Sequence, residues 1–373
     1  MAKTLNYLGI DLSGSSIKLV ELRNAGNGRP QLMTYGFIDE TYNIIKDDNP
    51  AARTAIANQL KELIKQTRAT STSAVTALPS FSVFSSIINL PAMKDKDLVS
   101  AIRWEAKKFV PIPLEEMILD WEVLKETAAI KTMPATTGEQ PEKKDEKVAE
   151  KKDKEDGAPK GNLRILMTAA PKNLVNRYVE LFKMVGLQLV GLETESFALE
   201  RSLVGNDLNP VMVIDIGSQT SSIIIFSGGV PILNRSIDVG GKGITRSLQE
   251  SMGLTAEQAE QFKRDVGMSV TAESLAKLPR PIGYVINSII NEIRYILNIY
   301  QNQNKKPITK VIFTGGSAFL ANMSSNIENI FNIKSYIGDP WARVIHPVEI
   351  DSLLKELGPR MAVSIGLAMR EII

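Results

Sequence analysis

Two stretches decide the fold: residues 8–22, which read LGIDLSGSSIKLVEL, and residues 212–226, which read MVIDIGSQTSSIIIF. In each, an apolar run includes an aspartate close to its end, a turn of small and hydroxyl residues follows, and a second apolar run comes after the turn. Aligning the stretches places Asp11 on Asp215. One such unit alone would be an ordinary hairpin with a polar tip. Two in register indicate two related lobes that face each other.

The chemistry of the two turns suits a triphosphate. Small residues let backbone N–H groups approach phosphate oxygens, and Ser and Thr hydroxyls add donors. Two facing carboxylates repel each other, and a hydrated Mg²⁺ between Asp11 and Asp215 removes that repulsion. Lys18 is placed to neutralise a β- or γ-phosphate. The candidate binding residues of the two turns are Asp11, Ser13, Gly14, Ser15, Ser16, Lys18, Gly217, Ser218, Gln219 and Thr220, with Asp11 and Asp215 as the metal ligands.

Two glycine pairs extend this site. Gly315 and Gly316, followed by Ser317, come after the apolar run 311–313 and let the backbone pass close to a base or ribose. Gly240 and Gly241, followed by Lys242, do the same beside the phosphates. The chain has neither the G-K-[ST] of a P-loop nor a G-x-G-x-x-G turn here, which disfavours both of those folds.

Composition narrows the chemistry. The 373 residues include 44 Lys and Arg, 42 Asp and Glu, no cysteine and one histidine, His346. This excludes thiolate chemistry, disulfides and Cys/His zinc sites, and the net charge of +2 gives no basic field for nucleic acid. No run approaches the ~20 apolar residues of a membrane helix. We therefore expect a cytoplasmic protein that reaches a membrane only through partners.

Between the lobes the pattern changes. A strand at 83–90, a helix at 97–110, strands at 117–124 and 163–169 and a helix at 173–185 have the size of a small inserted domain. Within it, 13 of the 16 residues in 141–156 are charged. Such a segment buries too little apolar surface to offset its ordering entropy, so the sequence predicts a disordered loop over 127–161.

The order and spacing of these motifs resemble the actin/Hsp70/sugar-kinase superfamily and, within it, the PilM family of type IV pilus assembly proteins, which are related to the division protein FtsA. The matching residues are LGIDLS at 8–13, VPIP at 110–113, LDW at 119–121 and VGGKGIT at 239–245. The resemblance implies an α/β, actin-like (ribonuclease H-like) two-lobe fold with a small inserted α+β domain of the 1C/SHS2 type. The first lobe would comprise 1–81, 186–210 and a final helix at 359–373, the insert 82–185, and the second lobe 211–358.

The resemblance also implies ATP with Mg²⁺ in the cleft. By position, Glu195 on a helix at 193–204 matches the residue that orients the attacking water. Glu292 on the long helix 282–300 matches the residue that contacts the ribose. Any hydrolysis would be that of a weak Mg-dependent ATPase. A sugar-kinase activity would need a carboxylate base aimed at a sugar pocket, and the sequence offers none.

Partners follow from the resemblance alone. They are the N-terminal peptide of a PilN-type inner-membrane protein, the pilus motor ATPases and the platform protein. The resemblance leaves undecided whether the protein also forms a homo-oligomeric ring. Trp104, Phe109 and Trp121 would lie near the peptide groove, or serve as core residues. The expected function is an ATP-binding scaffold that relays nucleotide state within the pilus assembly complex. An FtsA-like filament-forming membrane tether and a nucleotide-free actin-like adaptor are the alternatives.

Overall fold

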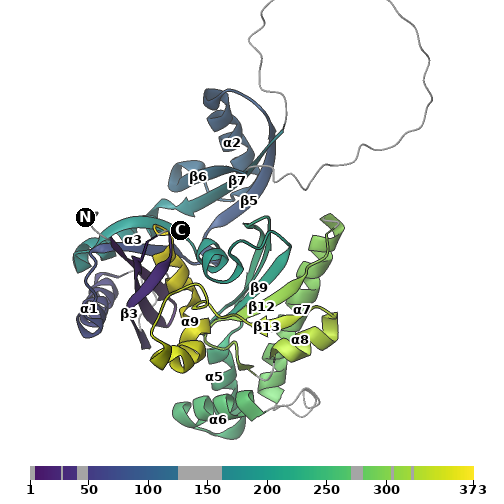
Figure 1. Ribbon diagram of the computed structural model, residues 1–373. Helices are drawn as coiled ribbons and strands as arrows, with labels where there is room; N and C mark the ends of the chain where they lie inside the picture. The colour runs from purple at the N-terminus through teal and green to yellow at the C-terminus, as the bar shows by residue number, and fades with distance from the viewer. Residues whose placement is uncertain are drawn as a thin grey trace, which may run out of the picture. The chain divides into compact units, whose positions relative to one another are not determined.

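The computed structural model describes residues 5–26, 28–39, 49–124, 162–269, 280–303, 306–320 and 323–373. The chain forms two compact units, one of Met1–Val83 with Ala170–Ile373 and the other of Phe84–Ala169 (Figure 1). The expected disordered loop at 127–161 lies outside the described residues. Among those residues, none of the helices has the length and apolar composition that a membrane span needs.

The larger unit contains two five-stranded sheets. The first has the order β3-β2-β1-β4-β8 and consists of β1 (Asn6–Ser13), β2 (Ser16–Asn24), β3 (Pro30–Asp39), β4 (Ser73–Leu78) and β8 (Gln188–Thr194). β1, β2 and β3 are antiparallel neighbours, and β4 and β8 continue the sheet in parallel. The register pairs Asp11 with Lys18, so the turn between β1 and β2 holds both charges at one end of the sheet.

The second sheet repeats the first. Its order is β11-β10-β9-β12-β13, and its strands are β9 (Val211–Ile216), β10 (Ser221–Ser227), β11 (Val230–Ile237), β12 (Lys310–Thr314) and β13 (Ser335–Ile337). β9 takes the place of β1, with an antiparallel neighbour on one side and a parallel one on the other. The structure thereby contains the internal repeat that the sequence predicted, and Asp11 and Asp215 occupy equivalent strands.

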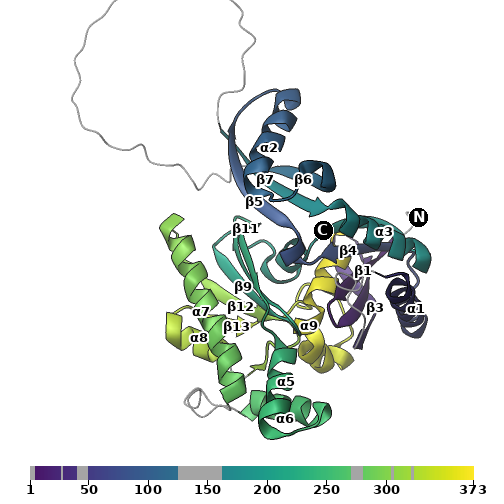
Figure 2. The same ribbon diagram turned by 180° about the vertical axis from the view of Figure 1, so that it is seen from behind.

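Helices bury the apolar faces of both sheets. α1 (Pro50–Thr67) and α3 (Lys172–Val185) share one core with the first sheet. The second sheet shares a larger core with α5 (Gly241–Met252), α7 (Arg280–Gln303) and α8 (Met323–Phe331), and Figure 2 shows α7 and α8 beside each other there. α6 (Ala256–Ser269) contacts α5. α1 begins at Pro50 because the Asn49 side chain accepts from the Ala52 amide, which satisfies one free N–H of the first turn.

Two helices join the lobes. α4 (Glu195–Leu199) continues into a π-helical turn, Glu200–Val204, instead of forming the single regular helix expected at 193–204. α9 (Asp351–Met369) contacts strands of both sheets. It begins at Asp351, before the expected start at residue 359, and Pro359 lies inside the helix. Proline is common in a first turn but also marks an interior kink, and the sequence alone does not separate the two.

The smaller unit comprises β5 (Phe84–Pro91), α2 (Asp95–Phe109), β6 (Met117–Leu124) and most of β7 (Asn162–Pro171), with the strand order β5-β7-β6. It is shorter than the expected insert 82–185, because α3 buries Tyr178, Leu181 and Phe182 in the core of the first lobe. In the insert, Trp121 packs at the edge of the core, whereas Trp104 is 62% exposed.

Candidate functional site

A cavity of about 420 Å³ lies where the turns of the two sheets meet in the larger unit. This volume is within the range of small-ligand pockets. Most residues predicted from the sequence line it: Asp11, Ser13, Gly14, Ser15, Ser16, Lys18, Glu195, Asp215, Gly217, Ser218, Gln219, Thr220, Gly315 and Gly316. The repeat therefore brings two turns from distant parts of the chain to one cavity.

Asp11 and Lys18 form an ion pair at the first turn. The Lys18 Nζ lies 2.7 Å from Asp11 Oδ2 and 3.3 Å from the Ser13 Oγ, and both charged side chains are largely buried. Because β1 and β2 are in register at these residues, the pair is fixed by the hairpin. The ammonium is thus held at the pocket wall, where a phosphate oxygen would find a cation.

Asp215 sits against the glycine turn that follows β12. A Cβ built on Gly315 would lie 2.3 Å from Asp215 Oδ1, and Gly315 has a φ of +91°, so only glycine fits here without strain. Burial raises the pKa of Asp215 to about 6; Lys18 opposes this shift and the charge of Asp11 adds to it. Asp215 is therefore ionised at neutral pH but poorly compensated, which favours a cation beside it.

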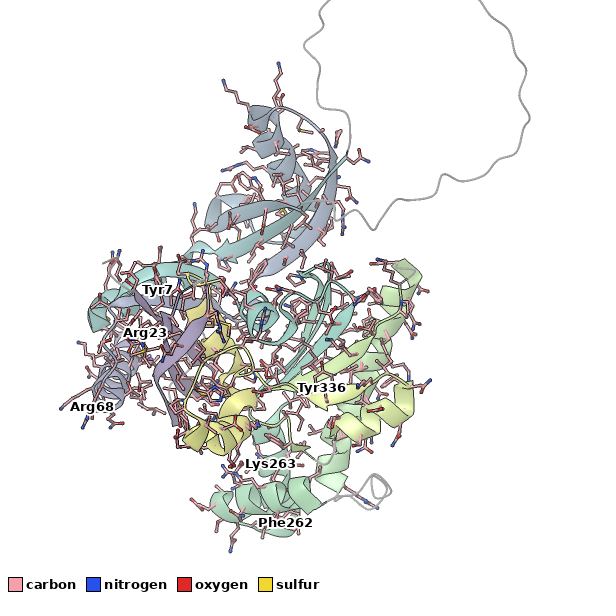
Figure 3. All side chains as sticks on the ribbon, in the orientation of Figure 1. Tyr7, Arg23, Arg68, Phe262, Lys263 and Tyr336 are labelled. Carbon is pink, nitrogen blue, oxygen red and sulfur yellow. The ribbon has the colours of Figure 1, made fainter. Side chains whose placement is uncertain are left out.

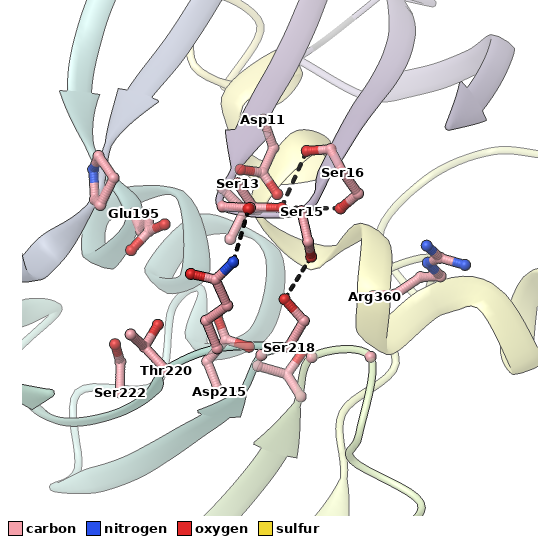
Figure 4. Close-up of a pocket in the computed structure, with 18 of the residues that line it drawn as sticks. Asp11, Ser13, Ser15, Ser16, Glu195, Asp215, Ser218, Thr220, Ser222 and Arg360 are labelled. Atoms are coloured by element: carbon pink, nitrogen blue, oxygen red, sulfur yellow. Dashed lines mark hydrogen bonds between the residues drawn. The ribbon is translucent and has the colours of Figure 1, made fainter. Parts of the chain in front are cut away.

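Glu195 begins α4, and its Oε2 accepts a hydrogen bond from the Ser80 amide at 3.0 Å. Burial raises the pKa of this carboxyl to about 8, and the charges of Asp11 and Asp215 act in the same direction. Glu195 is consequently mostly protonated at pH 7. Figure 4 shows Glu195 apart from Ser13, Ser15 and Ser218 of the two turns.

Replacing Glu195 with glutamine should change how stability depends on pH. The folded protein retains a proton between about pH 4.5 and pH 8 that the unfolded chain releases, so Glu195 lowers stability as pH rises through this window. We expect Glu195→Gln to match wild type near pH 4 and to exceed it by about 1–3 kcal/mol at pH 9. Urea unfolding across this range measures the difference. Glu62→Gln, an exposed change on α1, is the control, and parallel profiles for wild type and Glu195→Gln would contradict the assignment.

The two turns are hydrogen-bonded to each other. The hydroxyls of Ser15 and Ser218 are bonded directly (Figure 4). The Gln219 amide donates to the Gly14 carbonyl at 3.0 Å. Figure 4 shows Ser15 reaching from the first lobe toward Ser218 in the second. The side chains of the turns therefore connect the lobes across the cavity.

Gly240, Gly241 and Lys242 were predicted to contact phosphates, but they lie behind the second turn and not along the cavity wall. The Gly241 amide donates to the Gly217 carbonyl at 3.0 Å, and the Lys242 amide donates to the Ser218 carbonyl at 2.7 Å. The N-terminus of α5 thus braces the second turn. Ser317 also lies off the cavity wall, and its amide donates to the Ile216 carbonyl.

Glu292 is a further predicted residue that does not line the cavity. Its carboxylate pairs with Arg235 on β11, and the Arg235 guanidinium lies 4.8 Å from the centre of the Tyr295 ring. The periodicity of α7 showed which face is buried but not which neighbour the exposed face meets.

Sequence reasoning missed Glu260 and Lys263 on α6. The Lys263 Nζ lies 2.6 Å from Glu260, 3.0 Å from the Thr245 Oγ1 and 3.3 Å from the Gly241 carbonyl, and Figure 3 shows Lys263 on the α5 side of α6. A Cβ on Gly241 would lie 3.4 Å from that ammonium and 2.4 Å from the Ser317 Oγ. This ion pair thus borders both glycine turns. Its sequence signal is an acid and a lysine one helical turn apart, directly after the helix that follows Gly240.

The cavity wall also includes residues that the sequence analysis did not name as binding residues. They are Asp39, Pro79, Phe81, Leu199, Ser222, Asp238, Thr314, Pro359, Arg360, Ala362 and Val363. Arg360 pairs with Asp39 at 2.5 Å and stacks 3.8 Å from the centre of the Phe37 ring. The Pro359 carbonyl accepts from the Thr314 hydroxyl and the Gly315 amide, so α9 holds the glycine turn in place.

These residues fit Mg-ATP. In the described part of the chain, no three acidic or histidine side chains gather as a metal cage. Mg²⁺ suits such a site because it commonly takes one or two carboxylates and completes its shell with water and phosphate oxygens. Asp11 and Asp215 can supply those carboxylates, and the hydroxyl-rich turns and Lys18 can bind the phosphates.

Comparison with known proteins agrees with this fold. A family model described as type IV pilus assembly protein PilM matches residues 9–134 and 151–372. The cell division protein FtsA of Borreliella burgdorferi is 23% identical over 180 residues, which are 43% of this chain and 42% of that protein. The chain thus spans less than half the length of this relative.

Solved structures extend the likeness. A chain of a PilM–PilN type IV pilus biogenesis complex superposes with a TM-score of 0.78, 25% identity and 98% coverage of both chains. The ethanolamine utilization protein EutJ of Carboxydothermus hydrogenoformans gives a TM-score of 0.53 at 16% identity, covering 98% of this chain and 89% of that one. MreB5 of Spiroplasma citri bound to AMPPNP gives 0.50 at 13% identity, covering 98% and 95%. The last two show the fold alone, and together the three confirm the predicted actin-like fold. Since the family model covers nearly the whole sequence, this chain belongs to the PilM family of type IV pilus assembly proteins.

Proposed function

We propose that this protein is a cytoplasmic, ATP-binding scaffold of the type IV pilus inner-membrane assembly complex. It binds the N-terminal peptide of a PilN-type membrane protein and relays its nucleotide state to that partner. The observation that carries the nucleotide part is the cavity between two repeated strand–Asp–turn–strand units, lined by Asp11, Lys18 and Asp215. The pilus motor ATPases and the platform protein are its further partners, and the protein reaches the membrane only through partners.

Peptide binding rests on the family. A structure that matches 98% of this chain at 25% identity is that of a PilM–PilN complex. Type IV pilus assembly is the role of the family, and a PilN-type protein is the partner named for its solved relative. The exposed aromatic side chains of Trp104 and Phe109, both on α2 of the inserted unit, are candidate contacts for the peptide.

A hydrogen-bond path supports the relay. Glu195 in the cavity accepts from the Ser80 amide, and Ser80 precedes Phe84, where the chain passes into the inserted unit. The Ser80 hydroxyl is 3.4 Å from that of Ser196, which accepts from the Asn234 amide of β11 at 3.1 Å. The segment leading to the insert is therefore bonded to the cavity, to the joining helix and to the second lobe. Closure of the lobes would act on it directly.

Hydrolysis is at most slow in this proposal. Asp11 and Asp215 would hold Mg²⁺, which would neutralise charge on the phosphates, and Glu195 would orient the attacking water. Glu195, with its pKa raised to about 8, is a poor proton acceptor at neutral pH because it is already protonated. The chain is thus better suited to sensing ATP than to turning it over.

Isothermal titration calorimetry tests the function. Mg-ATP and the PilN-type N-terminal peptide are titrated separately and then each in the presence of the other. We expect both to bind, and each to change the affinity of the other by one and the same factor, about 5- to 150-fold. Peptide binding without ATP binding would instead make the protein a nucleotide-free adaptor. Binding of neither would remove the pilus-scaffold assignment for this chain.

A further inference from the structure

The contacts between the two phosphate turns use the groups that a phosphate would need. Ser15 and Ser218 each contribute a hydroxyl, and Gln219 contributes an amide N–H. Phosphate oxygens only accept hydrogen bonds, so the Ser15 and Ser218 hydroxyls are among the donors that the turns offer a phosphate, beside their backbone amides and other hydroxyls. These two hydroxyls and the Gln219 amide are engaged between the lobes, over sequence separations of 203 and 205 residues.

Each turn is also held by hydrogen bonds within its own lobe. In the first turn, the Ser13 hydroxyl lies 3.0 Å from the Ser16 carbonyl and 2.8 Å from its hydroxyl. In the second, the amides of Gly241 and Lys242 brace the carbonyls of Gly217 and Ser218 from behind. The cross-cavity bonds therefore join two fixed loops and hold the lobes in one relative position, instead of tethering loose ends.

Gln219 distinguishes two states of this cavity: one in which the turns contact each other directly, and one in which a phosphate lies between them. Its amide is neutral and donates to a carbonyl, the Gly14 oxygen, which repels a phosphate oxygen. A phosphate between the turns would take this partner from the amide, and Ser15 and Ser218 would turn from each other toward the phosphate. Ligand binding and direct contact of the turns thus compete for the same space and donors.

We propose that Gln219, together with the Ser15–Ser218 contact, is a latch that closes the cleft by joining the lobes and that a phosphate must break, so that Gln219 lowers nucleotide affinity. The effect on affinity rests on the proposed ATP binding, whereas the latch itself does not. A net hydrogen bond of ordinary strength corresponds to roughly a 2- to 12-fold change in an equilibrium constant. Removing the Gln219 side chain should therefore tighten Mg-ATP binding about three- to tenfold.

The test has one readout that involves no nucleotide. Because the chain lacks cysteine, spin labels can be placed on cysteines introduced at two exposed positions, Lys61 on α1 and Glu250 on α5. We expect Gln219→Ala and Ser218→Ala to lengthen or broaden the distance between lobes in the full-length protein without ligand. Gln261→Ala, which removes an exposed glutamine of α6 that bonds Asp265, is the matched control and should leave the distance unchanged.

Mg-ATP titration of the same variants supplies the second readout. Gln219→Ala should bind Mg-ATP about three- to tenfold more tightly, whereas Ser218→Ala should bind it more weakly because it also loses a phosphate donor. Weaker binding by Gln219→Ala would make Gln219 a phosphate ligand and overturn the latch, as would an unchanged distance between lobes. If the lobes open but neither wild type nor variant binds Mg-ATP, the latch stands and the nucleotide function fails.

Discussion

Asp215→Asn is expected to abolish measurable Mg-ATP binding, a loss of about a hundredfold or more. The change removes one of the two carboxylates that can hold Mg²⁺, at a partly buried position where the loss of a charge partner costs about 3 kcal/mol or more. Asparagine preserves the shape against Gly315, whose α-carbon leaves no room for a larger group. Calorimetry with Mg-ATP measures the loss, and peptide binding should persist.

The same variant should not be less stable than wild type. Asp215 has a pKa of about 6, above its ordinary value of 3.8, so the folded state binds its proton more readily than the unfolded chain. Its ionised form therefore lowers stability above pH 6, and Asp215→Asn removes that effect. Asp238→Asn, at an exposed carboxylate of the same cavity, is the control and should change ATP affinity less than about threefold. A loss of stability in step with the loss of binding would mean that Asp215→Asn misfolds, and the metal assignment would then lose its support.

The repeat and its two aspartates could be predicted because their signal is local. Within each stretch, an apolar strand, a small-residue turn and a second strand follow directly in sequence, and the register pairs Ser13 with Ser16 around the first turn. Hydrophobic strands of this kind form the centres of sheets. The facing of Asp11 and Asp215 then follows from the similarity of the two lobes and needs no further information.

What sequence could not give is which surface a helix meets. α3 has a strong apolar face, but nothing local says that it packs on α1 rather than on the strands of the insert. Glu292 and Glu260 both lie on helices of the second lobe, and only the path of the chain decides that Glu260 borders the glycine turns while Glu292 pairs with Arg235. Such choices depend on packing between segments far apart in sequence.

The bonds between the turns were beyond prediction for the same reason. Ser15, Ser218 and Gln219 were each predicted as phosphate contacts from their own turns. Their contacts with the opposite turn form only where the lobes come close enough, and α4 and α9 are the helices that connect the lobes. These helices bring the two turns within reach of each other, and α9 is where a single substitution should disturb that arrangement most.

Gly366→Val is expected to destabilise the protein by about 3 kcal/mol or more. A Cβ at Gly366 would lie 1.9 Å from the Ala198 carbonyl oxygen, so α9 and α4 cross with their backbones in contact. Ala198 is fully buried and backbone atoms cannot rotate away, so a larger residue forces the helices apart. Urea unfolding measures the loss. The control is Gly283→Ala on α7, where nothing lies within 4 Å, and it should stabilise by about 0.5–1 kcal/mol.

The consequence should reach the nucleotide site through the same crossing. The Arg201 Nε donates to the Gly366 carbonyl at 2.9 Å, and its guanidinium pairs with Glu193, two residues before Glu195. On its other side, α9 presents the Ser364 carbonyl to Gly9 of β1, so the helix is in backbone contact with α4 and with the strand that carries Asp11. The milder Gly366→Ala should therefore weaken Mg-ATP binding even where the protein remains folded, because Asp11 and Asp215 no longer face each other across the cavity at the same distance. If Gly366→Ala binds Mg-ATP as wild type does, the spacing of the lobes is set elsewhere than at this crossing.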